Sequence, residues 1–288
     1  MKYNTSMFDS IRDAINKQQK QNTGTRDIIS FEKGNTYVIR LLPFIQDPDK
    51  TWFKYSTFGW NSFATGAYTS IISPTSWNER DPVAEERIRV YRNGTETEKE
   101  KIKNIRRSDR WIMNVYVVSD PTNPENNGKV KIIRFGKQLY NIINNAISGE
   151  DADEFGAKVF DLSSAGVNLK VKVEDQGGYA NYTASRFTSP IDLKLSENQI
   201  EEIYNSTKEL DKVFNVRSYD DIKKILEEHY YCSPATPAAP LARAAVASEQ
   251  SAHAKQFGES TDAVGVESID DDEDDDEKMR KLIEELSA

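Results

Sequence analysis

The most regular alternation of apolar and polar positions lies in the stretch VNLKVKVE, which begins at Val167. Val167, Leu169, Val171 and Val173 are apolar, and the residues between them are polar. A period of two residues is typical of a strand with one buried face. We therefore predict a half-buried strand here, and DQGG predicts a turn from it into YANYTASRF.

Three other stretches have the composition of strands. TYVIRLLP is stopped by Pro43, while RWIMNVYVV and KVKIIRFG flank the turn-forming DPTNPENNG and so predict a hairpin. Helical spacing follows in KQLYNIINNAIS, whose apolar positions form one stripe. Two more helices are predicted after Ser196 and Ser218, which stand at N-cap positions. The pattern predicts a mostly β protein with flanking helices, of the α+β class.

The two ends of the chain have different patterns. Phe8, Ile11 and Ile15 form a narrow helical stripe within an N-terminal arm, residues 1–25. Residues 233–269 are rich in Ala, Ser and Pro and predict a disordered linker. Residues 270–288 form an acidic tail that ends in a short apolar stripe starting at Met279. The predicted partner-binding residues of the tail are Asp270, Asp271, Asp272, Glu273, Asp274, Asp275, Asp276, Glu277, Leu282, Ile283 and Leu286.

Charge is distributed unevenly along the chain. The formal net charge is −9, but residues 1–190 carry a net +4 and residues 191–288 a net −13. Lys129, Lys131, Arg134 and Lys137 fall within nine positions that contain no acid. Such asymmetry favours a body that binds nucleic acid or a membrane surface and carries an acidic tail.

Several classes of protein have little support. One cysteine, Cys232, excludes an internal disulfide framework, and with only His229 and His253 it cannot form a Cys/His zinc cluster. No signal peptide or membrane-length apolar run is present, which predicts a cytosolic-type protein. Nucleophile elbows, phosphate-binding glycine loops and metal-spaced histidine pairs are also missing, so we expect no enzyme.

Cations interleaved with aromatic residues favour single-stranded nucleic acid, because such sites combine a positive path for phosphates with rings on which bases stack. Trp111 and Phe135 fit a buried core position as well as a base platform, and Lys170 and Lys172 fit the solvated face of a strand. The candidate residues are Arg106, Arg107, Arg110, Trp111, Lys129, Lys131, Arg134, Lys137, Tyr140, Tyr179 and Tyr182.

Two long strings carry a family resemblance. VVSDPTNPENNGKVKIIRFGKQLYNIINNAI and VNLKVKVEDQGGYANYTASRF, followed by an acidic tail, resemble the T-even-type phage single-stranded DNA-binding proteins. These are the helix-destabilising proteins of the phage replication fork. The order and spacing match over roughly residues 40–187, most sharply from Asn114 onward. The D-P-x-x-P-E-N-x-G-K-V…R-F-G-K string is specific, whereas the linker and tail are generic.

The resemblance implies an OB-fold core, residues 26–232, with an inserted subdomain at about residues 58–105. It also implies cooperative, sequence-independent binding of single-stranded DNA and a tail that contacts replication and recombination proteins. The host bacterial cytoplasm is the implied location. Arg134 and Lys137 fall on the basic positions of the family's R-F-G-K, Tyr140 on a family aromatic, and Tyr179 and Tyr182 on its G-[FY]-x-N-Y pair.

Two departures from the family pattern matter. Arg106, Arg107 and Ser108 look like a shortened form of its basic Ser/Thr stretch, and the N-terminal MKYNTS has only Lys2 for the cooperative contact. Familiar members carry a zinc site of one His and three Cys in the segment that matches Phe58–Arg92, which here contains neither residue type. We therefore predict a variant without zinc, in which aromatic packing, together with SPTSWNERDPVAEERIRVY, holds the subdomain.

Two alternatives to DNA binding stay open: a single-stranded RNA-binding translational regulator, and an interaction scaffold that uses only its tail. The acidic tail also has two readings. It can shield the basic site until DNA displaces it, or it can simply keep the protein soluble.

Overall fold

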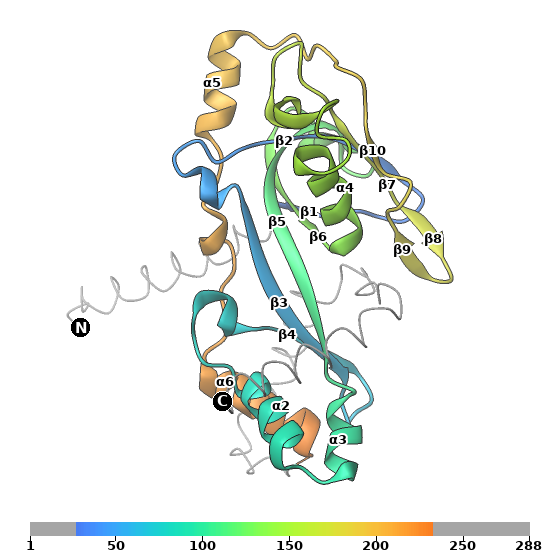
Figure 1. Ribbon diagram of the computed structural model, residues 1–288, viewed down its shortest axis with the longest axis vertical. Coiled ribbons are helices and arrows are strands. Elements are labelled where there is room, and N and C mark those ends of the chain that lie inside the picture. Colours follow the sequence, from blue (N-terminus) through green and yellow to red (C-terminus); the bar gives the residue numbers. More distant parts are fainter. Residues whose placement is uncertain (1–26, 233–288) are drawn as a thin grey trace, which may run out of the picture.

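The computed structural model describes residues 27–232, so the N-terminal arm, the linker and the acidic tail lie outside the described residues. Most of the regular structure belongs to one eight-stranded sheet flanked by helices, which confirms the mostly β, α+β class (Figure 1). Its main path runs through β1 (Ile28–Ile29), β6 (Val130–Phe135), β5 (Arg106–Ser119), β2 (Thr36–Leu41), β7 (Leu169–Lys172) and β10 (Arg186–Phe187), with β3 (Trp52–Asn61) and β4 (Tyr68–Ile72) branching from β5.

Strand β5 is shared by both parts of the sheet. Its C-terminal half pairs antiparallel with β6 on one edge and with β2 on the other. Its N-terminal half pairs with β3, which in turn pairs with β4. In Figure 1, β3 and β5 run side by side from the upper group of strands to the lower group of helices. The predicted hairpin of β5 and β6 and the predicted strand β2 are thus confirmed.

The upper group of elements surrounds the larger core. The α4 helix (Lys137–Ser148) lies over the sheet (Figure 1) and buries Leu139, Ile143 and Ala146, as its apolar stripe predicts. Val167, Leu169, Val171 and Val173 are buried in the same core, which confirms the alternating strand. The DQGG turn joins β8 (Glu174–Gln176) to β9 (Tyr179–Asn181), and Gly177 and Gly178 both take the positive φ that this turn requires.

Both predicted serine caps are present. Ser196 begins α5 (Glu197–Asn205) with a full capping box, and Ser218 begins α6 (Tyr219–Leu226) by accepting a hydrogen bond from the Asp221 amide. A π-helical turn, Glu227–Tyr231, continues α6. Short 3₁₀ turns lie at Pro48–Lys50, Pro74–Trp77, Pro124–Asn126, Gly156–Phe160 and Leu210–Lys212.

The charged stretch after Asn78 contains two helices that were not predicted from the sequence. The α2 helix (Pro82–Asn93) is capped by Asp81, whose carboxylate accepts from two backbone amides, and Gly94 ends it. The α3 helix (Glu96–Ile102) starts with a capping box of Thr95 and Glu98. The signals Asp81-Pro82 and Thr95-x-x-Glu98 were present in the sequence, but dense charge obscured the apolar stripe.

A second core holds these helices to the lower end of β3 and β4. It contains Phe58, Trp60 and Ile71 from the strands, and α6 adds Ile222 and Leu226 from a distant part of the sequence. In Figure 1, α6 lies next to α2 at the lower end of the molecule. Burial of these side chains stabilises the lower group by about 25 cal/mol for each Å² of apolar surface removed from water.

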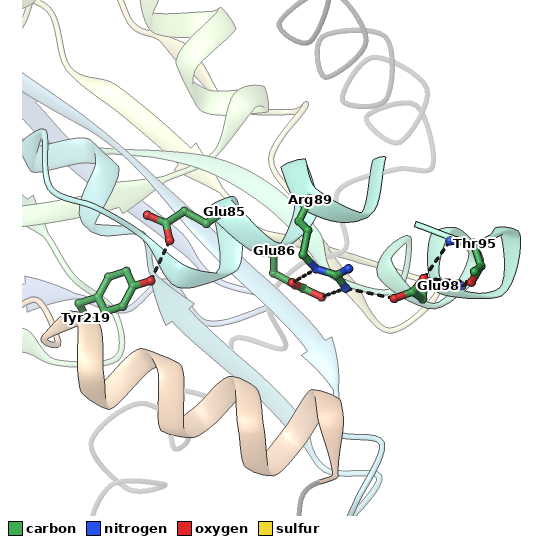
Figure 2. Close-up of polar contacts among 6 residues, drawn as sticks. All are labelled: Glu85, Glu86, Arg89, Thr95, Glu98 and Tyr219. Atoms are coloured by element: carbon green, nitrogen blue, oxygen red, sulfur yellow. Dashed lines mark hydrogen bonds and ion pairs between the residues drawn. The ribbon is translucent and has the colours of Figure 1, made fainter. Parts of the chain in front are cut away.

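Polar contacts join the same helices at their surface (Figure 2). The Arg89 guanidinium on α2 donates to both carboxylate oxygens of Glu86 and to Glu98 on α3, at 2.7–3.1 Å. The Tyr219 hydroxyl at the start of α6 donates to Glu85 on α2 at 2.7 Å. These contacts fix α3 and α6 against α2, although the exposed pairs each contribute little free energy.

A buried arginine organises the upper group. Arg40 on β2 is fully buried, and its guanidinium donates to the Asn168 side chain and to the carbonyl oxygens of Asp161, Ser163 and Ile191 at 2.7–3.2 Å. Burial lowers the pKa of Arg40, and the nearby Asp161 opposes that shift. The side chain thereby ties β2 to two loops that are more than a hundred residues further along the chain.

We expect Arg40→Met to destabilise the protein strongly, because it removes four hydrogen bonds and leaves the buried Asn168 side chain and three partly buried carbonyl oxygens without this donor. Each unsatisfied acceptor costs about 1–3 kcal/mol, so the free energy of unfolding should fall by at least about 3 kcal/mol. Urea unfolding followed by circular dichroism measures this. The control is Arg186→Met, at an exposed position on β10; equal midpoints for the two variants would contradict the assigned role of Arg40.

Candidate nucleic-acid interface

The pairing of β3 with β5 decides on which face of the sheet each candidate residue of these strands lies. We call residues 52–59 and 106–113 of these strands the ribbon; Lys54 lies opposite Trp111, and Tyr55 lies opposite Arg110. Side chains of successive strand residues point to opposite faces, and directly opposed residues share a face. The ribbon therefore has a Trp111 face, with Lys54, Ser56, Phe58, Arg107 and Asp109, and an Arg110 face, with Tyr55, Thr57, Arg106 and Ser108.

Polar side chains on the Trp111 face form one connected group. The Lys54 ammonium lies 2.5 Å from the Asp109 carboxylate, and Arg107 donates to the Ser56 hydroxyl at 2.9 Å. Burial tends to raise the pKa of Asp109, but the hydrogen bond from Lys54 and the charge of Arg107 hold that pKa below its ordinary value. Asp109 therefore stays ionised and fixes two cations at the middle of the ribbon.

Aromatic rings continue this face toward α4. Trp111 and Tyr140 stack with centroids 4.3 Å apart and planes 18° apart, and Trp52 lies 5.7 Å from Tyr140. The Lys54 ammonium lies 5.4 Å from the centroid of the Trp111 ring. Trp111 is only 8% exposed and Phe135 is buried too, so these rings belong to the core, whereas Tyr140 is half-buried. Trp111 thus supports Tyr140, which has the solvent-side position in the stack.

The other two candidate tyrosines lie in β9 and directly after it, and one of them contacts the same helix. The Tyr182 amide donates to the Gln138 side chain in the first turn of α4 at 2.8 Å. Tyr182 is half-buried and packs against the main core near Phe31, but Tyr179 is 46% exposed. Of this pair, Tyr179 has the accessible ring. Lys137 is exposed at the start of α4 and lies three residues before Tyr140, on the same side of that helix.

Three candidate arginines lie on the opposite face. Arg106 and Arg110 alternate with Arg107, and Arg134 on β6 lies opposite Ile112, so all three are on the Arg110 face. Burial raises the pKa of the Tyr55 phenol, and the charges of Arg134 and Arg110 act against that shift. Arg106, Arg107 and Arg110, which are close together in the sequence, are therefore divided between two faces.

Two candidate lysines lie apart from the ribbon. Lys131 is mostly buried and lies 3.6 Å from the Asp27 carboxylate, which also contacts Lys208. Lys129 is exposed in the turn before β6. The structure therefore does not place Lys129 and Lys131 beside Tyr140 in a single basic stripe.

Three residues that were not candidates from the sequence also lie at these faces: Trp52 and Lys54 on the Trp111 face, and Tyr68 beside Arg106 and Arg110. All three belong to the aromatic-rich stretch before residue 73, where the dense rings were the available signal. Within residues 27–232, no group of three or more His, Cys, Asp or Glu side chains is placed to hold a metal ion. The predicted tail residues 270–286 lie outside the described part of the chain.

No helix within residues 27–232 is long and apolar enough to cross a membrane.

Two similar proteins cover part of the chain. The single-stranded DNA-binding protein of Enterobacteria phage T4 is 34% identical over 93 residues, and that of Enterobacteria phage T2 is 36% identical over 85 residues. These matches span 32% and 29% of this chain, and only 30% and 28% of the two phage proteins.

A family model gives broader coverage. The gp32 DNA binding protein like family matches residues 5–229, which include both faces of the ribbon, α4 and the β8–β9 hairpin. The family is one of DNA-binding proteins and not a class of enzymes. The chain therefore belongs to the gp32 DNA binding protein like family.

Proposed function

We propose that this protein binds single-stranded DNA without sequence preference and that the DNA crosses the Trp111 face of the ribbon. The observation that carries the proposal is the half-buried Tyr140 ring, stacked on Trp111, with Lys54 and Arg107 on the same face. Rings of this kind stack on any base, and cations contact phosphates. Family membership and the names of the two phage relatives support the same ligand.

The arrangement favours binding that ignores sequence. Sequence readout needs side chains placed against base edges in a groove, whereas stacking uses the π-face common to all bases. The accessible groups here are tyrosine rings and the exposed cations Lys54 and Lys137. We infer that α4 and the β8–β9 hairpin extend the path, with Tyr179 as a further stacking ring.

We also infer that the strands of the upper group form an OB-fold core, because a curved β core of that kind is a frequent carrier of single-stranded nucleic acid. The family resemblance supports cooperative coating of DNA during phage replication, recombination and repair in the host cytoplasm. It further supports recruitment of fork proteins by residues 270–288. In this role the protein protects the single-stranded DNA and catalyses no reaction.

An RNA-binding regulator would use the same rings and cations. Competition between oligo-dT and oligo-U of equal length, followed by quenching of tryptophan and tyrosine fluorescence, separates the two functions. We expect DNA to compete at least as well as RNA. A strong preference for RNA would assign the protein to translational control, and failure of both ligands to bind would leave only the tail-based scaffold.

Tyr140→Leu should weaken binding of oligo-dT by about 1–3 kcal/mol, the usual contribution of one stacked base. Lys54→Gln should reduce the salt dependence by at most about 0.7 in the log–log slope, the value for one phosphate contact. Titrations at several salt concentrations measure both. The matched control is Lys212→Gln, an exposed lysine on the 3₁₀ turn after α5. If Tyr140→Leu binds like wild type while retaining its fold, the DNA does not cross this face.

Removal of residues 233–288 should tighten DNA binding at low salt. That segment holds 5 Lys+Arg and 14 Asp+Glu, so its loss removes a net charge of −9. A tethered acidic block competes with DNA for cations at high effective concentration, and salt screens that competition. Paired titrations of the full-length and truncated proteins at low and high salt test this. Equal affinities at low salt would favour a role for the tail in solubility alone.

We infer that the lower group of helices is stable without zinc. The support is the lack of Cys and His in residues 58–92 and the apolar core that Phe58, Trp60 and Ile222 share. A chelator should therefore leave the thermal unfolding midpoint unchanged, and elemental analysis of the dialysed protein should find no stoichiometric zinc. One zinc per chain would overturn the inference, since closed zinc sites use four ligands, mostly Cys and His.

A further inference from the structure

One carboxylate lies among the cations of the Trp111 face. Asp109 on β5 is directly opposite Ser56 on β3. The Lys54 ammonium lies 2.5 Å from one of its carboxylate oxygens, and the Arg107 guanidinium lies 3.5 Å from the other. The Ser56 hydroxyl donates to Asp109 at 2.8 Å and accepts from Arg107 at 2.9 Å. In the free protein, Asp109 therefore engages both cations that the ribbon presents on this face.

This carboxylate has the charge and the access that a competitor of phosphate needs. Burial alone would raise the pKa of Asp109, but the hydrogen bond from Lys54 and the charge of Arg107 hold that pKa below its ordinary value, so the group is ionised at neutral pH. The side chains of Asp109, Arg107 and Lys54 are 30%, 37% and 54% exposed. A phosphate that approaches from solvent can therefore reach the same two cations that Asp109 contacts.

Stability of the fold does not account for this arrangement. The backbones of β3 and β5 pair over the whole ribbon, and ion pairs exposed to this degree add little free energy. The position of Lys54 points to the ligand instead, because its ammonium also lies 5.4 Å from the centroid of the Trp111 ring that supports Tyr140. Asp109 thus acts on a cation that lies beside the stacked rings of the candidate DNA path.

We propose that Asp109 is an internal competitor for the phosphates of single-stranded DNA, which must displace it from Lys54 and Arg107. Carboxylate and phosphate oxygens are both charged acceptors for the same donors, so contact with one excludes the other. After displacement, the carboxylate still lies beside the path and repels the phosphate. Affinity is thereby held below what the cations and rings could give, which favours release of the DNA. This inference rests on the proposed function and assigns a control of affinity to the same face.

Asp109→Asn removes the charge, keeps the shape of the side chain and tests the competition directly. Oligo-dT should bind this variant about 5-fold more tightly at low salt, as loss of one like charge about 4 Å from a phosphate predicts in water. Dissociation, followed by stopped-flow fluorescence, should slow by a similar factor. Asp109→Glu keeps the charge and should show no such gain. The matched control is Glu209→Gln, which removes an exposed carboxylate from its lysine partner Lys212 and should leave affinity unchanged.

A double-mutant cycle separates competition for Lys54 from general repulsion. Lys54→Gln should weaken oligo-dT binding less in the wild-type background than in the Asp109→Asn background, because only in the former does DNA have to win the lysine from a carboxylate. The log–log salt slope should also steepen by about 0.7 in Asp109→Asn, since one more phosphate charge is neutralised without compensation. Equal losses from Lys54→Gln in both backgrounds would contradict a competition for this lysine.

Other outcomes overturn the inference or the proposed function separately. Weaker binding by Asp109→Asn, with a urea midpoint like that of the wild type, would make Asp109 a positioning residue that holds the cations for DNA. Unchanged affinity and slope would leave it no part in binding. If Asp109→Asn lowers the urea midpoint, Asp109→Ser removes the same charge with a smaller side chain, and the same gain in affinity is required of it. If the wild-type protein binds no oligo-dT, the proposed function itself fails.

Discussion

The antiparallel pairing of β5 with β3 is the constraint on which the rest of the structure depends. One 14-residue strand belongs to the upper sheet through β6 and β2, and to the lower helices through β3 and β4. Because strand side chains alternate, this pairing sends Arg107 and Trp111 to one face and Arg106 and Arg110 to the other. A shift of one residue in register would exchange the two faces and bury arginine in the main core.

The two faces of the ribbon carry different charged side chains at their paired positions. On the Trp111 face, Asp109 lies between Lys54 and Arg107, so the cations are held in place and their net charge is reduced. On the Arg110 face, Arg106 and Arg110 alternate with Ser108, and Arg110 lies near the Tyr55 phenol. An acidic protein can therefore carry local positive surfaces, since charges separated by more than a Debye length are largely screened from one another.

The chain returns to the lower helices after α5 and completes their apolar core. After α5 the chain crosses the Arg110 face, where Leu210 and Phe214 pack with Tyr55, and α6 then fills the core beside Phe58 and Trp60. The lower group is therefore closed by residues more than a hundred positions after its own strands. Apolar burial from α6 supplies cohesion that the segment 58–105 would lack by itself, and contacts of Tyr219 and Lys101 secure the returning chain.

Local rules in the sequence determined much of this protein. Alternation fixed the strand at Val167–Val173, serine caps fixed the starts of α5 and α6, and the apolar stripe fixed the buried face of α4, because each signal acts within a few residues. The sequence also singled out the strings shared with the DNA-binding family. What it left undecided was how the arginines of β5 divide between two faces, and that Tyr68 lies over Gly59 beside Arg106. Only the tertiary structure decided these points, because strand register and the meeting of distant segments depend on pairing energies summed over the whole sheet.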